Sequence, residues 1–149
     1  MAGTYALRRF IEQVVRRMVR TQRDFIEWTN WTPTVTQSGN VTVTVDLARY
    51  RLIGKSCRVA VHLTVTGAGT TANAIVIGGQ PAAIQPAYAG NDYVIGIAIV
   101  TDTGTTNYVG VLSAQTATGW QIMVDQSGNW LGIAPAFALA NTDLIAFEA

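Results

Sequence analysis

The chain has 149 residues, of which 49% are apolar and 13% are charged, and its net charge is +1. This length suits one domain, and the apolar share excludes a disordered chain and allows a buried core. The single cysteine, Cys57, excludes an intrachain disulfide and is expected to be a buried, unreactive thiol.

Residues 4–28 are predicted to form one amphipathic helix. Seven side chains recur at alternating spacings of four and three, which is the heptad spacing of a coiled coil; they are Leu7, Ile11, Val14, Met18, Thr21, Phe25 and Trp28. We expect this stripe to hold identical chains together, and its width favours more than two helices. Two alternatives stay open: packing on a protein surface, including the chain's own β domain, and binding to a membrane or nucleic acid.

The basic charge of the chain is concentrated in this segment. Residues 1–28 contain three acidic residues and six arginines, namely Arg8, Arg9, Arg16, Arg17, Arg20 and Arg23. Residues 29–149 contain four basic and six acidic residues. The arginines are expected to form a solvated face of the helix or to meet an acidic partner surface.

The stretch WTNWTPT joins the predicted helix to a β-patterned domain. Pro33 cannot continue a helix, and it biases Thr32 toward an extended backbone. We expect Trp28 and Trp31 to cover the seam between the helix and this domain.

Residues 29–149 are predicted to be a mainly β head domain. Period-two alternation and glycine-rich turns predict strands near 41–47, 58–66, 73–79, 92–102, 107–115, 119–125, 129–133 and 143–149. Such a series, with no helix between strands, predicts an antiparallel jelly-roll-like β-sandwich. Residues 67–72 are predicted to be a hairpin turn, and residues 80–93 the longest loop.

No catalytic, cofactor-binding or metal-binding residue is predicted. His62 falls on the polar face of its strand, where we expect it to be solvated or locally hydrogen-bonded, because the sequence has no second histidine. The acidic residues of the β domain stand mostly in turns or at strand ends. The first residues lack the pattern of a signal peptide, and no stretch of the sequence is long and apolar enough to span a membrane. We therefore expect the protein to be made in a cytoplasm and to stay soluble. A nucleic-acid partner is not expected for the chain as a whole, because the β domain is slightly acidic and the arginine face of the helix lacks interleaved aromatic residues; the helix alone keeps the alternative stated above.

Three short motifs carry a family resemblance. They are Trp31-Thr32-Pro33-Thr34 with Trp28 before it, the segment YRLIGK at residues 50–55, and the segment TDLI at residues 142–145. Together they resemble the C-terminal β-sandwich domains of bacteriophage tail-fibre and minor structural proteins. The segment GGQPA at residues 78–82 departs from that pattern, because it lacks a leucine before its proline.

The resemblance implies a non-enzymatic, homotrimeric virion appendage. Residues 1–28 would trimerise or dock, through the six arginines, to tail or capsid proteins, and residues 29–149 would be an exposed head. Two alternatives stay open: a capsid-decorating or head-fibre protein, and a lectin-like module of cellular origin.

An exposed head could bind a receptor or a host-surface glycan. Aromatic rings stack on sugars while nearby amides and carboxylates bind hydroxyl groups; the candidate contacts are Tyr88, Asn91, Asp92, Tyr93, Trp120 and Trp130. Trp120 and Trp130 have the alternative of being core residues, since each stands beside a glycine or at a strand start.

Overall fold

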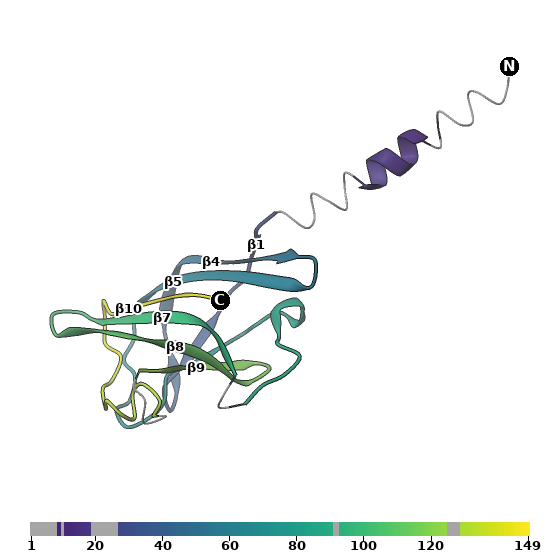
Figure 1. Cartoon of the computed structure of the whole chain (residues 1–149). Coiled ribbons are helices and arrows are strands. Elements are labelled where there is room, and N and C mark those ends of the chain that lie inside the picture. The colour runs from purple at the N-terminus through teal and green to yellow at the C-terminus, as the bar shows by residue number, and fades with distance from the viewer. Residues whose placement is uncertain (1–8, 10, 19–26, 91–92, 125–128) are drawn as a thin grey trace, which may run out of the picture.

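The computed structural model describes residues 9, 11–18, 27–90, 93–124 and 129–149. Residues 9 and 11–18 are helical, and the β domain comes after them (Figure 1). The predicted fold class is confirmed: the chain is mainly β and antiparallel, with one helix before the β domain.

Ten strands in the described ranges form one antiparallel sheet with the order β1-β4-β5-β10-β7-β8-β9-β6-β2-β3. The bounds are β1 Thr29–Asn30, β2 Thr34–Thr36, β3 Asn40–Val41, β4 Val43–Ile53, β5 Ser56–Val65, β6 Val76–Gly78, β7 Val94–Asp102, β8 Thr106–Thr116, β9 Gly119–Met123 and β10 Leu144–Glu148. A single 3₁₀ turn, η1 Ala82–Ile84, lies between β6 and β7.

The sheet curls on itself because the N-terminal strands switch position. One residue, Thr42, separates β3 from β4, yet β3 ends the strand order while β4 lies next to its opposite end. The segment that contains β1 and β2 makes the same crossing, with Pro33 between the two strands. Strands that switch sheets in this way form the corners of β-sandwiches. The two halves of the sheet thus enclose one core, as Figure 1 shows.

The core is the inner face of the curled sheet. On β5, Val59, Val61, Leu63 and Val65 are buried at alternate positions, as the sequence pattern predicts. From the other half, the indole of Trp120 meets Trp31 and Phe147 edge to face, at centroid distances of 6.2 Å and 6.0 Å. Trp31 therefore fastens the start of the domain to its centre.

Two buried polar side chains hold the loops against this core. The Gln37 amide donates to the carbonyls of Asn73 (3.1 Å) and Phe137 (2.8 Å) and accepts from the Leu139 N–H (2.9 Å). The Asp143 carboxylate accepts from the backbone N–H groups of Thr103 (2.9 Å) and Ala140 (2.8 Å). Each side chain satisfies groups that burial would otherwise leave without partners.

Two predictions about local structure were wrong. Residues 67–72 do not form a hairpin turn, because β4 and β10 occupy both edges of β5, and the chain crosses instead to β6 on the other half. Residues 129–133 form isolated bridges rather than a strand, since Gly132 adopts a positive φ of 99° and its N–H donates to the Pro135 carbonyl.

The predicted helix also ends earlier than expected. Glu27 and Trp28 are not helical, and β1 begins at Thr29, which pairs with Tyr50. The pairing of Thr29 with β4 requires an extended backbone before Pro33 is reached. Trp28 is thus not a heptad residue, which corrects its predicted place in the coiled-coil seam.

Candidate functional site

The outer face of the sheet is the side of β4, β5, β10, β7 and β8 that points away from the core. One row of residues across it consists of Leu47, His62, Ala146, Ile99 and Val109, as the strand registers show. A neighbouring row consists of Arg49, Ala60, Glu148, Ile97 and Val111. Aliphatic side chains therefore continue across a face that, in a β domain, is commonly polar.

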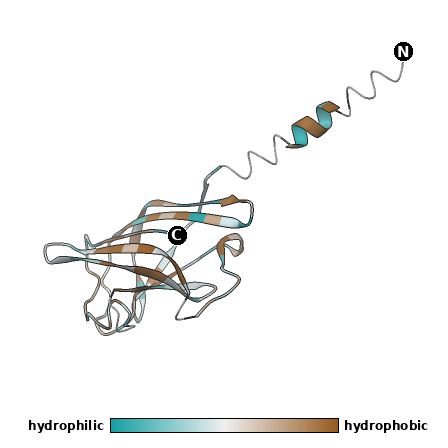
Figure 2. Cartoon of the chain, viewed as in Figure 1, coloured by the Kyte–Doolittle hydropathy of each residue, from teal (hydrophilic) through white to brown (hydrophobic). Residues whose placement is uncertain are grey.

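Several of these aliphatic side chains are open to solvent. The exposed fractions are 64% for Ile97, 61% for Val109 and 45% for Ile99. Hydrophobic residues run along β7 and β8 in Figure 2. Contiguous apolar surface of this kind is typical of a binding or assembly surface.

A shallow groove of about 700 Å³, the outer groove, runs over this face. Small side chains, Ala60 and Ala146, form part of its lining, and Ile97 and Ile99 stand on one side. Trp28 and Arg49 line it as well. The outer groove thus combines an aliphatic surface with a basic, aromatic end.

That end is built around Trp28, where the chain enters the β domain. The guanidinium carbons of Arg49 and Arg51 lie 4.5 Å and 4.8 Å from the centre of the Trp28 ring. Cation–π contacts of this length are attractive. Trp28 therefore packs on β4 and Trp31 packs in the core; the helix side of the seam that they were predicted to cover lies in residues 19–26, outside the described residues.

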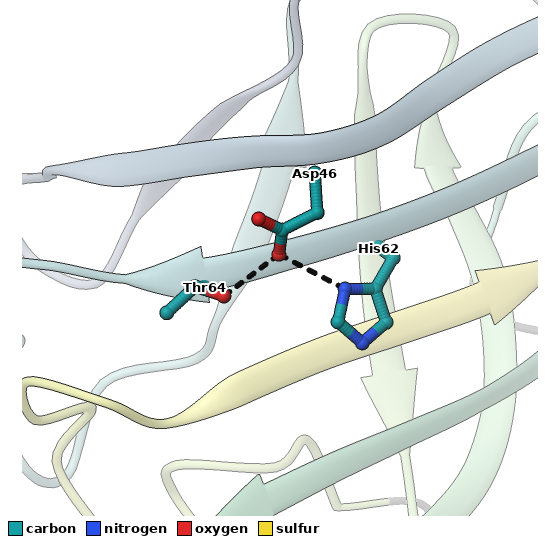
Figure 3. Close-up of polar contacts among 3 residues, drawn as sticks. All are labelled: Asp46, His62 and Thr64. Atoms are coloured by element: carbon teal, nitrogen blue, oxygen red, sulfur yellow. Dashed lines mark hydrogen bonds and ion pairs between the residues drawn. The ribbon is translucent and has the colours of Figure 1, made fainter.

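His62 lies on the same outer face and is locally bonded, as predicted (Figure 3). A β-bulge between Val45 and Leu47 turns Asp46 toward β5. The Asp46 Oδ2 accepts from the Thr64 hydroxyl (2.7 Å) and lies 3.0 Å from His62 Nδ1. The hydrogen bond from Thr64, together with the weaker effect of the one from His62, lowers the pKa of Asp46 below its usual value.

This trio does not have the arrangement of a catalytic triad. The Thr64 hydroxyl donates to the carboxylate, whereas in such a triad the hydroxyl donates to the imidazole and the carboxylate bonds only the imidazole. Within the part of the chain that the structure describes, no group of three His, Cys, Asp or Glu side chains could hold a metal ion.

The predicted glycan contacts separate into different environments. Tyr88 and Tyr93 are 67% and 38% exposed and meet edge to face, with ring centres 5.5 Å apart. Trp120 is buried in the core, which corrects its prediction as a surface contact. Trp130 is half-buried and forms an isolated antiparallel β-bridge with Met123, the last residue of β9. Asn91 and Asp92 lie outside the described residues.

Tyr93 also lines a second open cleft of about 660 Å³. This cleft lies between the β4–β5 turn, which contributes Lys55, the start of β5, which contributes Cys57, and the loop before β7. Cys57 is half-buried rather than buried as predicted, and burial raises the pKa of its thiol.

The helical stripe is described in part. Ile11 and Met18 are 52% and 63% exposed, and Val14 is half-buried. Leu7, Thr21 and Phe25 lie outside the described residues. Among the docking arginines, Arg9, Arg16 and Arg17 are exposed, whereas Arg8, Arg20 and Arg23 lie outside the described residues.

Sequence reasoning missed the outer face. The signal was present in the segment 93–100, where tyrosine, valine, isoleucine, glycine and alanine follow one another with no polar residue between them. A strand that is apolar at consecutive positions has two apolar faces. Arg58, which also lines the outer groove, was missed because the other residues of the groove come from strands that are distant in the sequence.

No family model, no curated protein and no solved structure matches the chain. In the described ranges, no helix has the length and hydropathy needed to cross a membrane.

Proposed function

We propose that the protein is a non-enzymatic structural protein of a bacteriophage virion that assembles as a homotrimer through its N-terminal helix. The observation that carries the proposal is the exposed apolar stripe of the helix, which includes Ile11 and Met18. An amphipathic helix that leaves this stripe in water needs a partner surface. The sequence resemblance to tail-fibre and minor structural proteins supplies the kind of assembly.

The β domain would be the exposed head of this assembly. This proposal is supported by the outer face of the sheet, which carries exposed aliphatic side chains although the core is already buried on the inner face. Such a face is suited to packing against another protein. The exposed Tyr88–Tyr93 pair is the part of the predicted glycan surface that a sugar ring could reach. The arginines of the helix would meet tail or capsid proteins.

The test measures the mass of the full chain in solution by light scattering. We expect three chains for the unchanged protein and one for the double variant Ile11→Asp, Met18→Asp, because charge in the seam opposes helix association. The matched control is Gln13→Asp, which adds the same kind of charge at an exposed position off the stripe. A single chain for the unchanged protein would overturn the proposal, and so would a trimer in the double variant.

A further inference from the structure

Three of the four basic residues of the β domain gather at one corner of the outer face. Arg49 and Arg51 are two positions apart on β4 and so share a face. Arg58 lies directly across from Arg51 in the β4–β5 register. With Trp28 stacked on the first two, these residues form what we call the arginine corner.

Among the described residues, the arginine corner has no carboxylate partner. Within the described residues, no carboxylate forms an ion pair with any of its three guanidinium groups; the ion pair on this face joins His62 to Asp46. The Nε atoms of Arg49 and Arg51 are buried without a hydrogen-bond partner. Like charges directly opposite one another destabilise a strand pair. An anion bound here would relieve this repulsion.

The geometry of the corner suits an oxyanion. The guanidinium groups of Arg49 and Arg51 both lie over the Trp28 ring, and a planar guanidinium presents paired N–H groups that match carboxylate or phosphate oxygens. Arg49 and Arg58 line the outer groove, so a ligand lying in the groove can reach them. Glu148, on the same groove, can accept from a hydroxyl group of that ligand.

The surrounding charge limits the size of the anion. Residues 29–149 carry four basic against six acidic residues, and three of the four basic residues are in this corner. A nucleic acid needs a basic surface that neutralises many phosphates. A compact site of three arginines fits one anionic group with a polar frame.

We propose that the arginine corner binds the oxyanion group of a sugar acid, a carboxylate or phosphate carried on a glycan that lies in the outer groove. The choice of a glycan rests on the proposed function, in which the β domain is an exposed virion head. The oxyanion site itself rests on the arginines and does not require the trimer.

The test titrates the full chain with sodium glucuronate, inorganic phosphate and glucose by calorimetry at low salt. We expect glucuronate to bind and glucose not to bind, with the affinity for glucuronate falling as salt is added. Arg51→Gln and Arg58→Gln should each weaken glucuronate binding about tenfold. Lys55→Gln is the matched control, because Lys55 lies in the exposed β4–β5 turn outside the corner, and it should bind as the unchanged chain does.

Phosphate binding without glucuronate binding, lost in the same variants, would support the oxyanion site and assign phosphate rather than carboxylate as the group that it binds. Binding of neither anion, or binding that both variants retain, would overturn the proposal. Thermal melts confirm that the variants are folded. If light scattering shows that Arg51→Gln or Arg58→Gln separates the copies while no anion binds, the corner is a subunit contact and the proposal is overturned.

Discussion

The two faces of the sheet contain the same kinds of apolar residue, but these residues are buried on one face and exposed to solvent on the other. Ile145 on β10 and Ile97 on β7 are both strand isoleucines, but Ile145 is fully buried and Ile97 is 64% exposed. The inner face finds its apolar partners within the chain, and buried polar groups such as Gln37 fasten loops onto it. The outer face is left with its aliphatic side chains in water. The inner face thus forms the core that stabilises the fold, while the outer face leaves its aliphatic side chains open to contact with another molecule.

The most direct test of this contrast makes the same substitution, isoleucine to threonine, on each face of the sheet. Ile145→Thr should lower the free energy of unfolding by about 4 kcal/mol, because it removes buried apolar volume and leaves a hydroxyl without a partner. Ile97→Thr should change it by about 0.5 kcal/mol or less. Urea denaturation of both variants measures the difference. Equal losses would mean that the outer face is packed against something in the folded monomer.

The polar anchors of the inner face should be nearly as important as its apolar residues. Gln37→Leu keeps the side-chain volume but leaves the Leu139 N–H and the carbonyls of Asn73 and Phe137 unpaired. We expect a loss of about 3 kcal/mol. Urea denaturation measures it, with the exposed Gln13→Leu as control. A loss below about 1 kcal/mol would show that other groups take over these hydrogen bonds.

The second anchor should have a smaller effect. Asp143→Ala leaves two backbone N–H groups, those of Thr103 and Ala140, without their acceptor. We expect a loss of about 2 kcal/mol. Asp102→Ala is the control carboxylate, at the end of β7. Should the two alanine variants unfold at the same urea concentration, the anchor role of Asp143 would be refuted.

The smallest effect expected is on the outer face, at Asp46. Its pKa in the folded chain is below the usual value of 3.8, so its interactions stabilise the fold above that value. This contribution is lost as the pH falls through the lowered pKa. The urea midpoint of the unchanged chain should therefore fall more between about pH 5 and pH 2 than that of Asp46→Asn. Asp102→Asn controls for general acid effects, and identical curves for Asp46→Asn and the unchanged chain would contradict the prediction.

The sequence predicted the inner face well and the outer face poorly. Alternation along residues 58–66 identified Val59, Val61, Leu63 and Val65 as one face because burial imposes a strict period of two. Alternation does not say which strands are neighbours, so the crossing at residues 67–72 was missed.

The same limit explains the predicted sites. Trp120 and Tyr93 both stand near glycines and loops in the sequence, but only the folded sheet places one in the core and the other at the surface. His62 was predicted to be solvated or locally hydrogen-bonded, and its partner in the structure is Asp46. A β-bulge brings Asp46 close to His62, and no local sequence pattern predicts that bulge. The arginine corner needs the β4–β5 register and the position of Trp28 together.

The bulge at Asp46 has a further consequence for how copies can meet. β1 pairs with two residues of β4, so within the described ranges much of the outer edge of this 11-residue strand has no neighbouring strand. A long, regular margin of this kind invites strand addition and aggregation. The bulge interrupts the spacing of backbone donors and acceptors there, and the charged side chain of Arg51 comes later on the same strand. These two features disfavour edge-to-edge association through β4, so in the proposed assembly the contacts between copies would use the faces of the sheet and the helix.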